Sequence, residues 1–138
     1  MTIHILALEK DLFFSVKMRD TLRHYDMEVK TVRSLSAFEE SLTAKDEVEF
    51  ALVIVNIATN GVDWETAIRK ARTAGLKVLA FGSHMDLEAR SKALEAGAQR
   101  VVANSKFTSD MPGLVQHTLD VPDDTSLNET ESEPESTI

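Results

Sequence analysis

The chain has 138 residues, of which 43% are hydrophobic and 28% charged, a composition typical of one globular domain and unlike that of a fibrous or wholly disordered chain. It has no cysteine, which excludes disulfides, thiolate zinc sites and cysteine nucleophiles. The longest apolar run, which ends at Val55, is far shorter than a membrane-spanning helix needs, and the N-terminus has no export signal. We therefore expect a soluble, cytoplasmic protein that makes no membrane contact.

The net charge of −8 is concentrated at one end of the chain. From Asp120 onward there are seven acidic residues and no lysine or arginine, which leaves 16 acids against 15 bases in residues 1–119. The segment 120–138 has too few apolar side chains to offset the entropy of ordering, so we expect an acidic, disordered C-terminal tail. The body, residues 1–119, has no basic stripe, which argues against direct nucleic-acid binding.

The first half of the body alternates strand and helix patterns. Residues 3–8 form an apolar run typical of a buried strand, and residues 27–32 alternate as a second strand does. Between them, apolar residues at helical spacing predict a helix capped by Asp11, with one face made of Phe14, Met18, Leu22 and Tyr25. Ser36 and Glu39 have the spacing of a capping box for a second helix, whose inward residues are Leu35, Phe38 and Leu42.

The second half continues this alternation. Strands are predicted at residues 50–55, 77–81 and 100–103, the first of them apolar throughout, as in a central strand covered on both faces. Helices are predicted from Asp63 to Gly75, from Asp86 to Gly97, and over about 109–119, where Pro112 falls in the first turn. Five strands alternating with five helices predict an α/β fold: a doubly wound, five-stranded parallel sheet with helices on both faces.

Functional residues of such a sheet lie at the carboxyl ends of its strands, where the strand order reverses. In this sequence those positions are Glu9, Lys10, Asn56, Gly82, Ser83 and Asn104.

Three stretches of the chain carry a resemblance to a known family. ILALEKD (residues 5–11), LVIVNIATNGVDW (residues 52–64) and LEAGAQRVVA (residues 94–103) are similar to the corresponding segments of the receiver domain of two-component response regulators, the chemotaxis-regulator-like fold. The resemblance spans residues 2 to about 119. It implies a flavodoxin-like sheet with strand order 2-1-3-4-5.

The resemblance also implies a set of site residues, most of which are altered here. The family's magnesium-binding acid pair falls on Glu9 and Lys10, and its phosphoacceptor aspartate on Asn56. The hydroxyl position falls on Gly82, next to Ser83, and the lysine position on Asn104, or on Lys106 if the loop holds one extra residue.

The altered residues bear directly on chemistry. An amide has no anionic oxygen to attack phosphorus, so Asn56 cannot form an acyl phosphate. Because magnesium prefers several oxygen ligands, Glu9 beside Lys10 and Asn56 makes a poor site for it. We therefore expect a degenerate pseudo-receiver that binds no metal and no cofactor. Lys10 is either a solvated side chain or the counter-charge of Glu9.

Other chemistry finds little support. Ser83, His84 and Asp86 lie too close together in sequence for a catalytic triad and are typical of a turn followed by a helix cap. The five glycines are too far apart to form a phosphate-binding loop. The chain is therefore not expected to be an enzyme.

Two functions remain. The first is a stand-alone signalling module that binds a signalling protein or effector domain independently of phosphorylation. The resemblance places its partner surface, and any self-association, on the fourth helix, fifth strand and fifth helix, with Arg90, Lys92 and Glu95 exposed. The second is a sensor that binds an anionic metabolite in the vacated crevice near Lys10 and Asn104.

Overall fold

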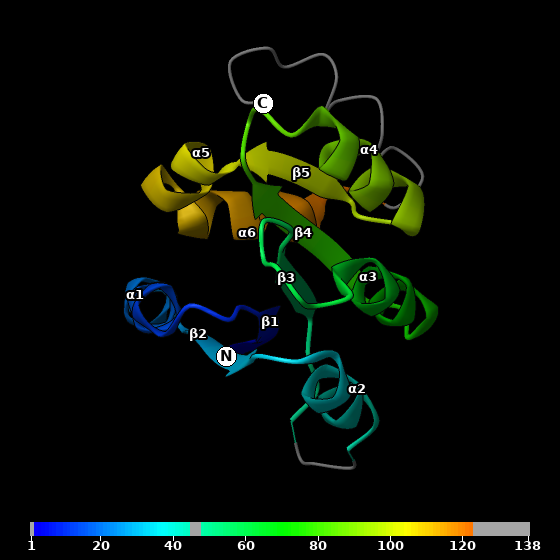
Figure 1. Ribbon diagram of the computed structural model, residues 1–138. Helices are drawn as coiled ribbons and strands as arrows, with labels where there is room; N and C mark the ends of the chain where they lie inside the picture. Colours follow the sequence, from blue (N-terminus) through cyan, green and yellow to red (C-terminus); the bar gives the residue numbers. More distant parts are fainter. Residues whose placement is uncertain (1, 45–47, 123–138) are drawn as a thin grey trace.

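The computed structural model describes residues 2–44 and 48–122, which form five strands and six helices. All strand pairs are parallel, and the sheet has the order β2-β1-β3-β4-β5 (Figure 1). The strands are β1 (Ile3–Leu8), β2 (Met27–Val32), β3 (Leu52–Asn56), β4 (Lys77–Gly82) and β5 (Arg100–Ala103). The predicted doubly wound sheet and its strand order are confirmed.

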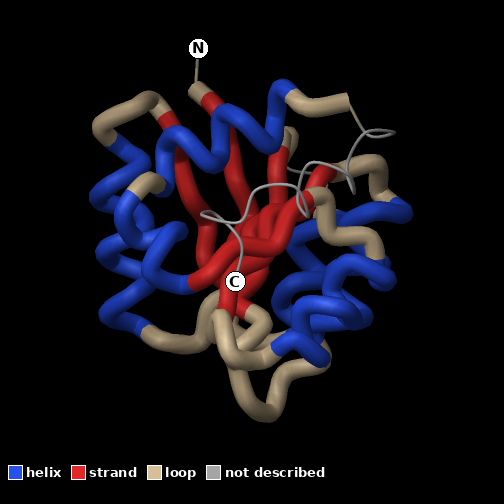
Figure 2. The backbone as a smooth tube through the Cα atoms, turned by 90° about the horizontal axis from the view of Figure 1, so that it is seen from above, coloured by secondary structure: helices blue, strands red, loops and turns tan. Residues whose placement is uncertain are grey.

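Helices cover both faces of the sheet (Figure 2). On one face lie α2 (Leu35–Thr43), α3 (Trp64–Thr73) and α4 (Leu87–Ala96), and on the other lie α1 (Leu12–Arg23), α5 (Asn104–Ser109) and α6 (Met111–Asp120). The prediction of five helices is wrong by one, because a short helix, α5, begins directly after β5. Pro112 lies in the first turn of α6, as predicted.

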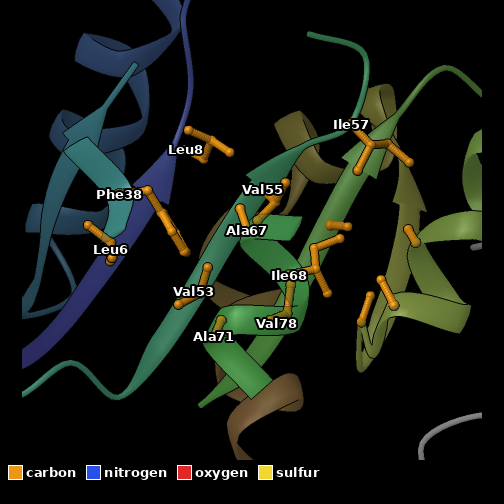
Figure 3. Packing of buried hydrophobic residues seen from close by; sticks show 14 of the residues in the cluster. Leu6, Leu8, Phe38, Val53, Val55, Ile57, Ala67, Ile68, Ala71 and Val78 are labelled. Carbon is orange, nitrogen blue, oxygen red and sulfur yellow. The ribbon is translucent and has the colours of Figure 1, made fainter. Parts of the chain in front are cut away.

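The central strand β3 explains the two cores. Its apolar residues, 52–55, are buried without a break, but successive side chains point to opposite faces. Val53 and Val55 pack with Phe38 and Ile68 beneath α2 and α3 (Figure 3), whereas Leu52 and Ile54 belong to the core beneath α1 and α6. A strand buried on both faces therefore reads as a continuous apolar run in the sequence.

Side-chain caps fix where the helices begin. Asp11, Asp63 and Asp86 accept hydrogen bonds from the backbone N–H three residues later, as the sequence predicted. The predicted cap at Ser36 is wrong: Ser34 caps α2 instead and accepts from the backbone N–H of Ala37. Tyr25 lies beyond the end of α1 and is exposed, so it does not extend the buried face of that helix.

The last described residues are held at the amino ends of β4 and β5, whereas the crevice lies at the carboxyl ends of the strands. The Lys77 ammonium donates to the carbonyls of Leu119 and Val121, and the Gln99 amide donates to the carbonyl of Pro122 at 3.2 Å. Because the described residues end at position 122, the predicted acidic tail, residues 120–138, lies almost wholly outside them. Across residues 2–44 and 48–122, no helix is both long and apolar enough to cross a membrane.

Candidate functional site

Strand register brings the first two site residues together. Leu8 of β1 lies opposite Val55 of β3, so the next residues along each strand, Glu9 and Asn56, face each other at the carboxyl edge. The Asn56 side-chain amide donates to both carboxylate oxygens of Glu9, at 2.9 and 3.1 Å. Two residues that are 47 positions apart thus form one polar pair.

Glu9 is a buried carboxylate with its hydrogen bonds satisfied. Only 1% of the residue is exposed, and its Oε2 also accepts from the backbone N–H of Asp11 at 3.0 Å. Burial raises the pKa of Glu9 because it disfavours the charged form, while the hydrogen bonds from Asp11 and Asn56 oppose this shift. Asn56 therefore serves as a neutral donor to a carboxylate that has lost most of its water.

The orientation of the Asn56 amide is fixed from both ends. Its Oδ1 accepts from the backbone N–H of Ala58 at 2.8 Å, while its Nδ2 donates to Glu9. A flipped amide would place its N–H₂ against an N–H and its oxygen against a carboxylate, so only one orientation satisfies both partners. Asn56 thereby joins the β1–α1 and β3–α3 connections.

The side chain of Lys10 does not take part in this pair. Its side chain is exposed, and its ammonium donates to the carbonyl of Asn60 at 3.3 Å. No ion pair joins Lys10 to Glu9 within the described residues. Of the two interpretations considered for Lys10, the geometry therefore matches the solvated side chain, and the partner of Glu9 is Asn56.

The hydroxyl position implied by the resemblance is filled by an apolar side chain from another loop. A Cβ on Gly82 would lie 2.7 Å from Cγ1 of Ile57, which is buried, so a larger residue there would require Ile57 to move. The backbone N–H of Ile57 donates to the carbonyl of Phe81 at 2.9 Å and holds this loop against β4. Gly82 and Ile57 are therefore complementary in shape.

Ser83 and Asn104 make only local contacts. The Ser83 hydroxyl accepts from the backbone N–H of Met85 at 3.1 Å and closes the turn before α4, as predicted. Asn104 is the exposed first residue of α5, and its carbonyl accepts from the Thr108 hydroxyl at 2.9 Å. Lys106 lies two residues further along α5. The six predicted site residues thus share one edge, but among them only Glu9 and Asn56 are joined by a side-chain hydrogen bond.

Two of the three residues predicted to be exposed on the partner-binding surface are exposed, and the third is not fully so. Lys92 and Glu95 are exposed, and the Lys92 ammonium lies 3.4 Å from the Glu88 carboxylate. The predicted exposure of Arg90 is only partly right, because the residue is half-buried and its Nε is enclosed without a hydrogen-bond partner.

An open cavity of about 410 Å³, which sequence reasoning missed, lies beside the crevice. It is bordered by the β3–α3 loop, by Trp64 and by the first turns of α3 and α4. Its charged lining residues are Asp63, Glu65, Asp86, Glu88 and Lys92. The sequence feature that could have indicated this acidic lining is the pair of helix caps, Asp63 and Asp86, each followed two residues later by a glutamate.

Asp63 titrates differently from Glu9. Hydrogen bonds from the hydroxyl and the backbone N–H of Thr66, at 2.7 and 3.1 Å, lower the pKa of this exposed carboxyl. The cavity therefore keeps a negative charge at neutral pH.

The residues at the carboxyl edge do not fit magnesium. Asn56 turns its N–H₂ toward Glu9, where a metal ion would need oxygen, and its oxygen is already hydrogen-bonded. Within residues 2–44 and 48–122, no three His, Asp or Glu side chains come together in a way that could hold a metal ion.

Comparisons of the fold place the chain among solved receiver structures. No protein-family model matches it, and no curated protein matches it. A putative response regulator from Chloroflexus aurantiacus has a TM-score of 0.73 and 22% identity, with 88% of this chain and 100% of that chain covered. For the chemotaxis response regulator CheY4 of Vibrio cholerae the TM-score is 0.69 and the identity 14%, with 86% and 99% covered.

A third neighbour is a CheY-like receiver domain protein from Methanospirillum hungatei, with a TM-score of 0.71 and 20% identity. That match covers 96% of this chain and 99% of the other. At these identities the similarity establishes the architecture and not the chemistry. The chain therefore has the fold of response-regulator receiver domains.

Proposed function

We propose that the chain is a pseudo-receiver that acts in signal transduction by binding a protein partner independently of phosphorylation. The observation that carries this proposal is the Asn56–Glu9 pair, which puts an amide donor where the resemblance requires a nucleophilic carboxylate. The pair needs neither phosphate nor metal to satisfy its polar atoms. On this proposal the crevice has one resting state, the chain catalyses no reaction, and its partner is a cytoplasmic signalling protein or effector domain.

The filled position beside Gly82 supports the same conclusion. Phosphoryl transfer depends on positioned charges and donors around the transferred group. Here the hydroxyl is missing and Ile57 occupies the space that a side chain at position 82 would need. A phosphoryl group at this edge would have no hydroxyl donor from residue 82.

The alternative, a sensor for an anionic metabolite, finds less support in the geometry. The ammonium of Lys10 is engaged with the Asn60 carbonyl, and the neighbouring cavity is lined by four carboxylates and one lysine. Since the lysine is paired with Glu88, the cavity repels anions. We therefore retain the protein-interaction function.

The proposal is tested by offering the full chain a phosphoryl donor. We expect intact-protein mass spectrometry to detect no acid-stable, base-labile adduct after incubation with acetyl phosphate and Mg²⁺. A partner isolated by pull-down should bind with the same affinity with and without the donor. An adduct in the crevice, or binding that changes with the donor, contradicts phosphorylation independence.

Asn56→Asp is the matched variant. It retains the size of the side chain but brings two carboxylates together, an arrangement that favours a divalent cation. We expect Mg²⁺ to raise the melting temperature of this variant and not that of the wild type. Efficient phosphorylation should still be absent from the variant, because Gly82 supplies no hydroxyl and Ile57 blocks its position.

A further inference from the structure

The first turns of α1 carry an exposed apolar surface. Large hydrophobic residues with substantial exposure are few in the described chain, and three of them lie within five consecutive positions. These are Leu12, Phe13 and Val16, with 61%, 91% and 45% of each residue exposed, and we call them the α1 patch. Clustered apolar side chains of this kind mark interaction sites more often than scattered ones do.

The local structure explains why Phe13 must point outward. Asp11 caps α1 and fixes its start, and the buried residues of the helix are Ser15, Met18 and Leu22. Phe14 is turned toward Phe81 and Phe107, with ring centroids 5.4 and 6.0 Å away. Because adjacent helical residues lie about 100° apart, Phe13 cannot share that aromatic cluster. Its exposure is thus a property of the helix and not of a loose loop.

The surroundings of the α1 patch are basic. Five exposed cations stand on α1 and at its N-terminal end against two exposed acids, and one of these acids, Asp11, is engaged as the helix cap. The cations are Lys10, Lys17, Arg19, Arg23 and Arg33. Arg33 is tied to this end by a hydrogen bond from its Nε to the Lys10 carbonyl at 3.2 Å. The basic character is local, since the whole chain carries a net charge of −8.

We propose that the α1 patch is the docking site of the signalling partner, and that the partner presents apolar side chains flanked by aspartate or glutamate. This inference rests on the proposed function and names the surface and the chemistry of its partner. Charge complementarity selects an acidic segment, because the cations around the patch would repel a basic one. It also disfavours a second copy of this chain, since two basic α1 faces would meet.

The surface around α4 offers an internal comparison. Met85 and Leu87 are also exposed apolar residues, at 76% and 64%, but they flank Asp86 at the acid-lined cavity. Lys92, which also lines that cavity, is paired with Glu88. An acidic partner is therefore disfavoured there, so Met85 is the matched control for Phe13.

Photo-crosslinking in the native host tests the proposal on the full chain. Phe13 and, separately, Met85 are replaced by p-benzoylphenylalanine, and the crosslinked peptides are identified by mass spectrometry. We expect position 13 to capture a segment of another protein that contains apolar residues beside Asp or Glu, and position 85 not to capture it. Crosslinks to a second copy, to residues 123–138 of the same chain, or at position 85 alone would overturn the proposal.

Substitutions then measure the contact with the identified segment. We expect Phe13→Ser to weaken binding by about tenfold or more, as at an interface hot spot, and Met85→Ser to leave it unchanged. Lys17→Glu should weaken binding several-fold at low salt and less at high salt, because exposed charges are screened. If Phe13→Ser and Met85→Ser bind equally, the docking site is wrong, although phosphorylation independence stands. If binding depends on Phe13 and also on a phosphoryl donor, the docking site stands and the proposed function fails.

Discussion

Glu9 and Asp63 are two carboxylates at the same edge of the sheet that respond to their surroundings in opposite ways. Glu9 is buried, and its pKa is raised although it accepts hydrogen bonds from Asn56 and Asp11. Asp63 is exposed, and its pKa is lowered by the hydroxyl and backbone N–H of Thr66. Both groups accept good hydrogen bonds, so the difference lies in desolvation.

This comparison shows how Glu9 is held although no charged side chain pairs with it within the described residues. A buried carboxylate usually requires a charged partner, whereas Glu9 is held by the neutral Asn56 amide and by backbone N–H groups. Desolvation is therefore opposed only in part, and the pKa of Glu9 stays raised. Asn56 is the residue on which this balance depends.

The largest expected effect follows from removing the Asn56 amide. In Asn56→Ala the buried Glu9 carboxylate loses its side-chain donor, and we expect the free energy of unfolding at neutral pH to fall by about 2 kcal/mol, as for other hydrogen bonds to charged groups. Urea denaturation measures this change. The loss should shrink in acid, because a protonated Glu9 needs the donor less.

Asn104→Ala provides the matched control. Asn104 is an asparagine at the same edge, but it is exposed and its side chain makes no hydrogen bond within the described residues. We expect a change of no more than about 0.5 kcal/mol. Similar losses in the two alanine variants would mean that the Asn56–Glu9 bond contributes little.

Much of this arrangement could be predicted from the sequence. Hydrophobic periodicity located the five strands, and the β-α alternation placed Glu9 and Asn56 at one edge. The hydrogen bond between them could not be predicted, because it depends on the register of β1 with β3 and on the fixed orientation of one amide. Likewise, the sequence shows Ile57 only as an apolar residue and Gly82 only as the end of a strand. The close contact between these two positions could therefore not be predicted.

The second effect concerns the cap of α3. Asp63→Ala removes the acceptor for two hydrogen bonds from Thr66, and we expect a loss of about 1 kcal/mol at pH 7 in thermal or chemical unfolding. Asn is as good a cap, so Asp63→Asn should retain most of the stability. A full loss in the asparagine variant would show that the negative charge, and not the cap, is what matters.

The two carboxylates also predict opposite pH dependences. The lowered pKa of Asp63 contributes stability that is present above its ordinary value of 3.8 and is lost as the pH falls through the folded pKa. Asp63→Asn should therefore remove part of the acid sensitivity. The comparison is made by subtracting the unfolding free energy of the variant from that of the wild type at each pH.

The contribution of Glu9 to stability depends on pH in the opposite direction to that of Asp63. Its folded pKa is raised above 4.5, so the folded state binds this proton more tightly and is favoured at low pH, and that advantage is lost as the pH rises through the folded pKa. Relative to Glu9→Gln, the wild type should lose stability as the pH increases from about 4.5. A flat difference between the two proteins would show that the hydrogen bonds to Glu9 fully offset its desolvation.

The helices show where local patterns were insufficient. α5 was missed because Asn104–Ser109 lacks a side-chain cap and is only six residues long, so no periodic face is visible. The cap of α2 was misplaced because Ser34 and Ser36 both suit the role, and only the backbone conformation at Ser34 decides between them. The second error concerns a helix end, where neighbouring residues compete for the same backbone N–H groups.

The smallest expected effect is that of Lys10→Ala. If Asn56 and the backbone N–H of Asp11 satisfy Glu9, then Lys10 contributes only an exposed hydrogen bond to the Asn60 carbonyl, and its removal should change the free energy of unfolding by no more than about 0.5 kcal/mol. The variant should also show no response to Mg²⁺, because the amide still faces the carboxylate. Melting curves with and without Mg²⁺ test both expectations. A loss larger than the roughly 1 kcal/mol available to an exposed pair, together with stabilisation by Mg²⁺, would mean that the ammonium acts on Glu9 across the crevice. Lys10 would then be a second side-chain partner of Glu9, beside Asn56.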